Sequence, residues 1–359
     1  MATIKDVARL AGVTPGTVSR AFNGYTIREE TKERIMKAAA ELNYTPNANA
    51  RSLSMKSAPN IGMIMEVPKE DLHDNFFLAM LVGAYRYSTA HQLEISVLIT
   101  DSEHQKQMSF EQFCARHNLQ GAIVTGISLT DPYYEEIRQS GIPCAMIDIA
   151  TDRPGSGWVT TDNVSAEKQM TEYLIRNGHK NIMIMAGKKN TTVDQERMEG
   201  VQKAFDEAGI PFRKDHVLRG DFSELTAYRK TLAWLQKYQE KYGKQGKNPS
   251  GDIAFLCFSD LMAFGVRKAI RECHYHIPDD FSLAGFDGHP VTDYMNPPIT
   301  TIDQNFESMG YEAARLLQKL MRNPGISEKV YVPYLFCEKG SVSRLAGPSA
   351  QKTEQSPDI

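Results

Sequence analysis

Cysteines are few in this sequence of 359 residues, and they show no pattern of a disulfide framework or a zinc site. The five cysteines are odd in number, widely separated and without a C-x-x-C pair: Cys114, Cys144, Cys257, Cys273 and Cys337. No apolar run reaches the roughly 18 to 20 residues of a membrane-spanning helix, and no hydrophobic signal segment follows Met1. These absences predict reduced, mostly buried thiols and a cytoplasmic protein.

Signatures of common enzyme classes are absent too. The sequence contains no G-x-x-x-x-G-K-[ST] loop, no G-x-S-x-G nucleophile elbow and no H-E-x-x-H zinc motif. The run that comes nearest to a metal cluster is Cys273-His274-Tyr275-His276, whose adjacent spacing does not place ligands on one helical face. The end of a helix before Ile277-Pro278 explains this run better. We therefore expect no enzyme activity, no cofactor and no metal.

The charge is unevenly distributed along the chain. Residues 1–60 carry nine Lys and Arg against five Asp and Glu, a net charge of +4, whereas the remaining residues carry 32 against 39, a net charge of −7. The length exceeds that of a usual single domain, and 41% hydrophobic with 24% charged residues is typical of globular proteins. A small basic head on an acidic body suggests a polyanion-binding module, although ordinary solvated surface would also fit.

Local signals in this head predict a helix-turn-helix. Thr3-Ile-Lys-Asp6 has the form of a capping box, and Gly12 suits the left-handed end of a first short helix. Thr14-Pro15 starts a second helix as N-cap and N1 proline, and Asn23-Gly24 stops it. Thr26-Ile-Arg-Glu29 predicts a further capping box that opens a third helix. Such a motif places its second helix in the DNA major groove.

Longer motifs make the sequence resemble the lac-repressor family of bacterial transcription regulators. They are Thr3-Ile-Lys-Asp-Val-Ala, Ala11-Gly-Val-Thr, Thr17-Val-Ser-Arg, Leu42-Asn-Tyr-Thr-Pro-Asn and Ala50-Arg-Ser-Leu. The match is specific over residues 3–57 and continues more loosely to about residue 343. The resemblance implies that Pro15, Gly16 and Arg20 face the bases. Because the first two offer no side-chain hydrogen bond, we expect Arg20 to be the main reader, bidentate to guanine.

The same resemblance implies a hinge helix over residues 47–55, which enters the minor groove and wedges Leu53 between base steps. It also leaves several polar side chains for phosphates or water. The full set of expected DNA-binding residues is Thr3, Thr14, Pro15, Gly16, Thr17, Ser19, Arg20, Asn23, Asn49, Arg51 and Leu53.

Beyond Pro59, apolar β-like runs alternate with amphipathic helical stretches, a pattern that indicates parallel α/β sheets. The expected strands cover residues 61–67, 95–100, 122–125, 144–149, 182–186, 253–258 and 281–286, and the expected helices cover 83–91, 168–177, 199–208 and 262–273. We predict two doubly wound halves, divided near the polar turn at 152–157. The resemblance implies a bilobed core like that of periplasmic binding proteins, with return crossings at 300–304 and 331–333.

These expectations define the predicted domains. They are a helix-turn-helix domain over residues 1–46, a hinge and linker over 47–59, a bilobed core over 60–344 and a disordered tail over 345–359. The N-lobe takes about 60–160 and 304–331, and the C-lobe about 161–303 and 332–344. Residues 237–250, rich in Lys and Gly, are predicted to form a surface loop without an assigned role. Tetramerising leucine heptads are absent, so we expect a homodimer.

The resemblance also implies a set of effector-binding residues in the cleft: Phe76, Arg197, Phe222, Ser259, Asp260 and Asp287. Asp148 joins this set because an acid at the carboxyl end of an apolar strand is typical of a binding site. Asp287 in Gly285-Phe-Asp-Gly288 matches the family best, and Ser259 is a smaller residue than the usual Asn. Core packing, a solvated salt bridge and helix capping remain structural alternatives for Phe77, Arg197 and Asp260. Carboxylates, an arginine and aromatic rings suit a sugar, whose hydroxyls donate and whose C–H face stacks.

The sequence thus predicts a dimeric regulator, expected to be a repressor of pseudo-palindromic operators, that is controlled by a sugar or sugar derivative. A purine-like metabolite or a partner protein remains an alternative effector, because a purine would also use a ring and one acid. A solute-binding protein without a regulatory role is a remote alternative that the helix-turn-helix disfavours. The sign of the effector's action and the operator sequence stay open.

Overall fold

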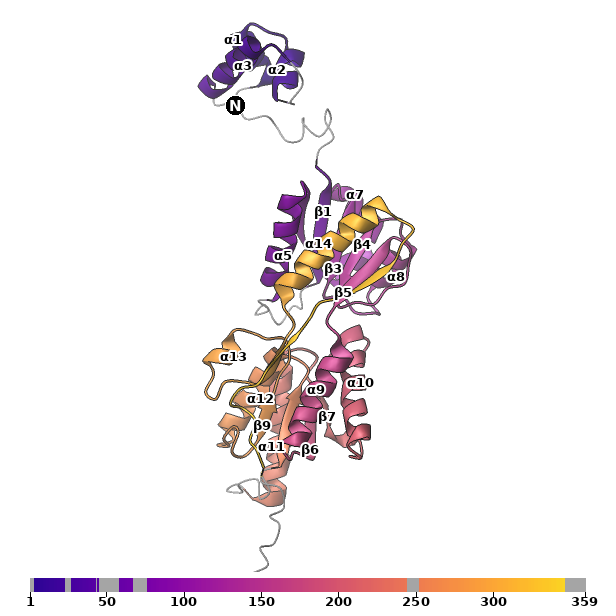
Figure 1. The fold of residues 1–359 in the computed structure, drawn as a ribbon, viewed down its shortest axis with the longest axis vertical. Helices are drawn as coiled ribbons and strands as arrows, with labels where there is room; N and C mark the ends of the chain where they lie inside the picture. The colour runs from indigo at the N-terminus through magenta and orange to yellow at the C-terminus, as the bar shows by residue number, and fades with distance from the viewer. Residues whose placement is uncertain are drawn as a thin grey trace, which may run out of the picture. The chain divides into compact units, whose positions relative to one another are not determined.

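The computed structural model describes residues 3–22, 27–42, 44, 58–66, 76–243 and 252–345 (Figure 1). The chain divides into two compact units, Met1–Pro59 and Asn60–Ile359. Among the helices in these ranges, none is both long and apolar enough to cross a bilayer.

The first unit is a three-helix domain made of α1 (Ile4–Ala11), α2 (Pro15–Phe22) and α3 (Glu29–Glu41). The capping box predicted at Thr3 is present, because the Thr3 hydroxyl accepts from the Asp6 amide at 3.4 Å while the Asp6 carboxylate accepts from the Thr3 amide at 2.9 Å. Gly12 ends α1 at a φ of 66°, a left-handed conformation that glycine adopts at no steric cost. The predicted helix-turn-helix is thereby confirmed.

A small apolar core holds these helices together, with Val7, Val18 and Ile35 fully buried at its centre. The start of α3 differs from the prediction. Its N-cap is Arg28, whose side chain makes no capping hydrogen bond, and Thr26, where the capping box is expected, lies outside the described residues. Glu29 and Glu30 in the first turn supply the favourable negative charge at this helix end instead.

The N-lobe of the second unit is built on a six-stranded parallel sheet in the order β11-β5-β4-β3-β1-β2. Its strands are β1 (Asn60–Glu66), β2 (Glu94–Thr100), β3 (Gly121–Thr125), β4 (Cys144–Ile147), β5 (Ser156–Thr160) and β11 (Glu328–Tyr331). One face packs against α5 (Phe76–Ala90) and α14 (Phe306–Arg322), and the other against α7 (Phe110–Arg116) and α8 (Pro132–Gln139). The short α6 (Ser102–Gln107) follows β2.

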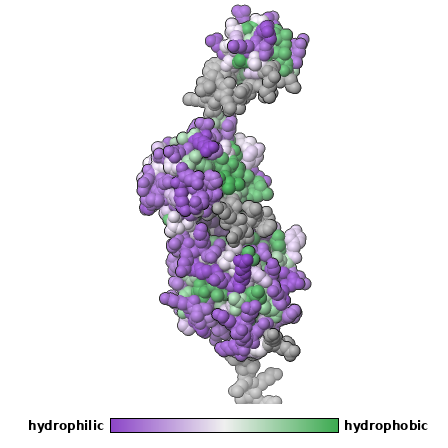
Figure 2. Space-filling view, turned by 180° about the vertical axis from the view of Figure 1, so that it is seen from behind, coloured by the Kyte–Doolittle hydropathy of each residue, from purple (hydrophilic) through white to green (hydrophobic). Residues whose placement is uncertain are grey.

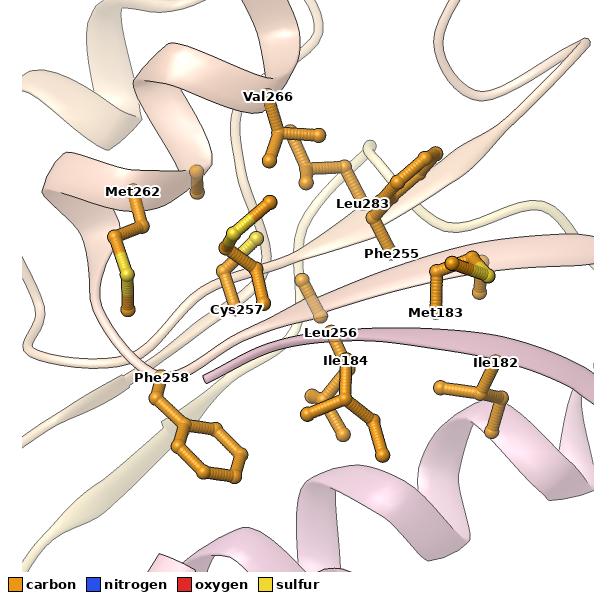
Figure 3. Close-up of a cluster of buried hydrophobic side chains, with 14 of the residues drawn as sticks. Ile182, Met183, Ile184, Phe255, Leu256, Cys257, Phe258, Met262, Val266 and Leu283 are labelled. Carbon is orange, nitrogen blue, oxygen red and sulfur yellow. The ribbon is translucent and has the colours of Figure 1, made fainter. Parts of the chain in front are cut away.

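The C-lobe has a four-stranded parallel sheet in the order β7-β6-β8-β9. Its strands are β6 (Asn181–Ala186), β7 (Val217–Arg219), β8 (Ile253–Cys257) and β9 (Ser282–Ala284). The helices around it are α9 (Asn163–Arg176), α10 (Thr192–Glu207), α11 (Glu224–Tyr242), α12 (Asp260–Glu272) and the short α13 (Val291–Tyr294). Buried side chains of β6 and β8, such as Ile184 and Phe255, lie between the sheet and its helices (Figure 3).

The chain passes between the lobes three times: after β5, after β10 (Thr301–Asp303) and after β11. The last two passages occur at the stretches that the sequence analysis names as return crossings. There β10 pairs antiparallel with β12 (Leu335–Cys337). Two doubly wound parallel sheets therefore form the core, as predicted.

Some predicted boundaries are wrong. The stretch at 152–157, predicted as a turn, already contains the start of β5, and β7 was not predicted at all. Residues 237–242, predicted as part of a loop, continue α11 because Leu235 and Tyr238 anchor its buried face; residues 244–251 lie outside the described part. Leu345, predicted to be the first residue of the tail, is held in place, because its amide donates to the Asn177 carbonyl at 2.9 Å. Residues 346–359 lie outside the described part of the chain.

Candidate functional site

The first candidate site is the outer face of α2. Val18 and Ala21 are buried against the other helices, which leaves Pro15, Gly16 and Arg20 exposed, with Thr17 and Ser19 half-buried. The Thr14 hydroxyl accepts from the Thr17 amide at 3.2 Å, so Thr14 caps α2 while remaining exposed. Thr3 is likewise exposed. The other expected DNA contacts, Asn23, Asn49, Arg51 and Leu53, lie outside the described residues.

The second candidate site centres on Arg197, which α10 places in the C-lobe interior with only 3% of the residue exposed. Its Nε donates to Asn163 Oδ1 at 2.9 Å, and its Nη1 donates to the Phe258 carbonyl. Asp287 Oδ1 lies 3.7 Å from Nη1, and the guanidinium carbon lies 3.7 Å from the centre of the Phe286 ring. The buried positive charge is thus held by a carboxylate, two neutral acceptors and a ring face.

Asp287 follows β9 and has a φ of 124°, a conformation rare outside glycine. Gln304 Nε2 donates to Asp287 Oδ1 at 2.7 Å, and the Asp260 amide donates to Oδ2 at 3.3 Å. Asp260 is fully buried, and its carboxylate accepts from the His289 amide at 2.7 Å and the Thr301 hydroxyl at 2.8 Å. Burial raises the pKa of Asp260, and these hydrogen bonds oppose that rise.

The N-cap of α12 is Ser259, whose hydroxyl accepts from the Met262 amide at 3.2 Å. Ser259, and not Asp260, therefore caps α12. Asp260 instead ties the turn at Asp287 and His289 to the start of α12. Ser259 and Asp260 thus fix the start of α12 beside Asp287.

Asp148 connects the N-lobe to this cluster. It directly follows β4 and has a φ of 60°, and the Thr160 hydroxyl donates to its Oδ1 at 2.7 Å. Asn163 Nδ2 in turn donates to the Thr160 hydroxyl at 3.1 Å, which completes a chain of contacts from Asp148 to Arg197. Burial raises the pKa of Asp148, while the Thr160 hydrogen bond and the Arg197 charge lower it.

The two predicted aromatic residues lie apart from this hydrogen-bonded chain. Phe76, at the start of α5, packs edge-on against His289 with ring centres 5.4 Å apart and lies 4.4 Å from the Phe306 ring. Phe222 covers Gly187, where an added Cβ would come within 2.1 Å of the ring. Gly187 is therefore required for Phe222 to occupy its place.

The structure connects Asp148, Arg197, Ser259, Asp260 and Asp287 and adds four residues that the sequence analysis missed. They are Asn163, Gln304, His289 and Phe306. Gln304 is the last residue of the predicted crossing at 300–304 and Phe306 follows it, so their position in the sequence could have indicated them. No local signal marks Asn163 or His289. No group of three or more metal-binding side chains occurs among the described residues.

One buried acid near this site has no counterpart in the predictions. Glu167 on α9 is completely buried, and neither carboxylate oxygen has a hydrogen-bond partner among the described residues. Burial raises its pKa to about 8, and the Arg197 charge only partly opposes this. An acid with a raised pKa in the folded state binds its proton there more tightly than in the unfolded chain, so stability is lost as the pH rises toward 8.

Replacing Glu167 by Gln should therefore stabilise the protein, and the gain should grow between about pH 5 and pH 8. At the upper end we expect roughly 1–3 kcal/mol, less than the full linkage of the shift because the structure can relax. Urea unfolding at three pH values measures this. Glu172→Gln on the same helix, at a partly exposed site, is the control. A gain that did not change with pH would contradict the assignment of a buried, protonated Glu167.

Comparisons with known proteins agree with this arrangement. Residues 3–47 match the family described as bacterial regulatory proteins, lacI family, and residues 171–342 match the periplasmic binding protein-like domain. The HTH-type transcriptional repressor PurR of Vibrio parahaemolyticus is 32% identical over 333 residues, which cover 92% of this chain and 95% of the relative.

Solved structures share the fold. The lac repressor dimer bound to operator and the anti-inducer ONPF aligns with a TM-score of 0.78 at 23% identity, covering 95% of this chain and 99% of that one. A LacI family regulator from Enterococcus faecium with bound ribose aligns with a TM-score of 0.64 at 23% identity, covering 80% and 100%. The chain described here belongs to the lacI family of bacterial regulatory proteins and is a DNA-binding transcriptional repressor.

Proposed function

We propose that this repressor acts as a homodimer whose operator affinity is set by a sugar or sugar derivative bound beside Arg197 and Asp287. The observation that carries the proposal is the buried pair of Arg197 and Asp287, held in place by Asn163 and Gln304. A buried ion pair is weak evidence for stability, since its desolvation cost rivals its attraction. Preorganised charged groups in the C-lobe, connected through Thr160 and Asn163 to Asp148 of the N-lobe, instead suit the recognition of a polar ligand.

A sugar fits the chemistry of these groups. Its hydroxyls can donate to the carboxylates of Asp148 and Asp287 and accept from Arg197, in charge-assisted hydrogen bonds. Phe76 and Phe222 supply ring faces for the C–H side of the sugar. The relative from Enterococcus faecium that holds ribose shows that this fold accepts a small carbohydrate. A purine-like ligand is the alternative, and it would stack on one ring and donate to one of the acids.

On the DNA side, the proposal places α2 in the major groove. Its exposed residues Pro15 and Gly16 allow the backbone to approach the bases closely, and Arg20 provides the long donor. In this proposal the DNA phosphates are contacted by Thr3, Thr14, Thr17 and Ser19. Residues 47–55 enter the minor groove, where Leu53 is the wedge between base steps.

Ligand binding and DNA binding are linked through closure of the lobes. The Ala150 amide of the N-lobe donates to the Thr192 hydroxyl at 3.1 Å, and Lys329 Nζ lies 3.4 Å from Glu196 Oε1 on α10. Thr192, Glu196 and Arg197 belong to the same helix, so a ligand that moves Arg197 also affects these contacts. The closure state that the ligand prefers then favours or disfavours pairing of the two hinge segments on the operator.

The N-lobe exposes an apolar surface that fits a second copy of the chain. Leu78 and Tyr85 on α5 and Val97 and Ile99 on β2 are all exposed, with Ile99 at 65%. A hydrophobic patch is visible on the side of the N-lobe where α5 lies (Figure 2). Because β2 is an edge strand, an uncovered apolar stretch of this kind favours association.

Ile99→Glu should therefore weaken the dimer, since a charge would be buried against apolar side chains in the interface. We expect the dissociation constant of the dimer to rise at least about tenfold, equivalent to roughly 1.4 kcal/mol or more. Operator binding should weaken as well. Analytical ultracentrifugation measures the first effect. The matched control is Tyr331→Glu, at an exposed site on the opposite edge strand, β11. Equal dimer affinity in the two variants would place the interface elsewhere.

The proposed function is tested in two steps. Candidate sugars, sugar phosphates and nucleobases are titrated into the full chain by calorimetry, and each ligand that binds is added to an operator titration. We expect a sugar to bind and to change operator affinity by about 5- to 150-fold, the range of common allosteric couplings. Binding of a nucleobase alone would overturn the sugar assignment. If no ligand that binds altered operator affinity, the regulatory role of the cluster would be refuted.

A further inference from the structure

A cavity of about 460 Å³ lies at the end of α12 opposite to Ser259 and Asp260. Its volume falls within the range of sites for small molecules. Two arginines from the last turns of α12 line it, Arg267 and Arg271, together with His274 and His276 from the turn that follows. Ile277 and Pro297 provide apolar wall. Four basic side chains thus converge on a single hollow, at the far end of a helix whose first turn belongs to the effector site.

The two arginines lack acidic partners within the described part of the chain. Their spacing of four residues puts both guanidinium groups on one face of α12. Arg267 Nη2 donates to the Asn296 carbonyl at 3.0 Å, but neither arginine forms an ion pair with a described carboxylate. Burial and the charge of Arg271 lower the pKa of Arg267, because a partly buried guanidinium beside a like charge is less favourable than one in water.

Two acids near the cavity, Glu272 and Asp280, have partners other than the arginines. Glu272 accepts from the Tyr228 hydroxyl at 2.8 Å, on the side of α12 that faces α11. Asp280 accepts from the His276 amide at 2.8 Å and lies 3.4 Å from His276 Nδ1. His276 therefore has an acidic partner, whereas neither arginine has one among the described residues.

Basic residues near the end of a helix also interact favourably with its dipole, and this alone would justify one exposed arginine. It does not account for a partly buried Arg267 beside a second positive charge, inside a hollow with apolar wall. Guanidinium groups bind phosphate through two parallel hydrogen bonds, and an anion held between them would remove their mutual repulsion.

We propose that this cavity is a second ligand site, which binds a small organic anion carrying a phosphate group. The phosphate lies between Arg267 and Arg271, with His274 at the rim. The organic part of the ligand contacts Ile277 and Pro297. This site is separate from the effector cluster at Arg197 and does not depend on the identity of the effector.

The test uses phenyl phosphate and inorganic phosphate as probes, titrated by calorimetry into the full chain at constant ionic strength. Wild-type protein should bind phenyl phosphate saturably and more tightly than inorganic phosphate, because only the former has a ring to place on the apolar wall. Arg271→Gln should weaken phenyl phosphate binding by about tenfold or more. Lys268→Gln removes a charge from the same helix but outside the cavity lining, so it should leave binding unchanged.

Melting temperature and operator affinity serve as controls for Arg271→Gln. Arg271 is exposed, so Arg271→Gln should retain the wild-type melting temperature and the wild-type operator affinity. The retained operator affinity would separate this site from phosphate binding by the DNA-binding domain. Absence of saturable binding to wild-type protein, or equal weakening by Arg271→Gln and Lys268→Gln, would overturn the proposal.

Discussion

Raising the salt concentration from about 50 to about 200 mM should weaken operator binding by roughly a thousandfold or more. A dimer that contacts about 6 to 10 phosphates releases about 0.9 counterion for each, and the logarithm of its affinity falls linearly with the logarithm of the salt concentration. The charge distribution supports this expectation, because residues 1–60 carry a net charge of +4 while the rest of the chain is acidic. The electrostatic attraction to DNA therefore comes from residues 1–60.

The experiment begins with an operator selected from random DNA by the full chain, followed by titrations at several salt concentrations. Arg20→Ala should reduce affinity for this operator by about 1–3 kcal/mol and relax the preference at one base pair in each half-site. Arg28→Ala, at an exposed arginine that caps α3 only through its backbone, provides a control for the loss of one positive charge. A nearly flat salt dependence would refute the phosphate-contact model, and unchanged base preference would remove Arg20 from direct readout.

Asp287→Asn should abolish the response to the effector while leaving operator binding intact. The substitution keeps the size of the side chain but removes the charge that faces Arg197 at 3.7 Å and accepts from Gln304 at 2.7 Å. A charge-assisted hydrogen bond is worth about 1.5–3 kcal/mol, so effector affinity should fall about tenfold to more than a hundredfold. The DNA-binding residues belong to a separate compact unit and should not sense the change directly.

Calorimetry with the effector and operator titrations with and without it measure both consequences. Asp293→Asn is the matched control, since this aspartate is exposed on α13 and pairs with Lys339 instead. The variant also reveals the sign of regulation: loss of an inducer response leaves the operator permanently bound, whereas loss of a corepressor response leaves it free. Unchanged effector affinity in Asp287→Asn would remove Asp287, and with it the Arg197 cluster, from the effector site.

The helix-turn-helix could be predicted in detail because its signals are local. The reciprocal hydrogen bonds of Thr3 and Asp6, the glycine at position 12 and the N1 proline all act within a few residues. The parallel sheets were predictable for a related reason, since short apolar runs bounded by turns are typical of strands buried on both faces. These signals failed where they are weak, as in β7, which has only three half-buried residues.

The sequence by itself determined that this chain has a helix-turn-helix and a two-lobed α/β core, and its motifs pointed to Arg197 and Asp287. Only the tertiary structure decided which side chains surround them. Asn163 and Gln304 reach Arg197 and Asp287 from other elements, and the distances between them follow from how the strands are ordered and how the helices pack. The same holds for Arg267 and Asn296, which meet across the cavity at the end of α12. Contacts of this kind have no local signal, because burial and partner choice are properties of the packed core and not of neighbouring residues.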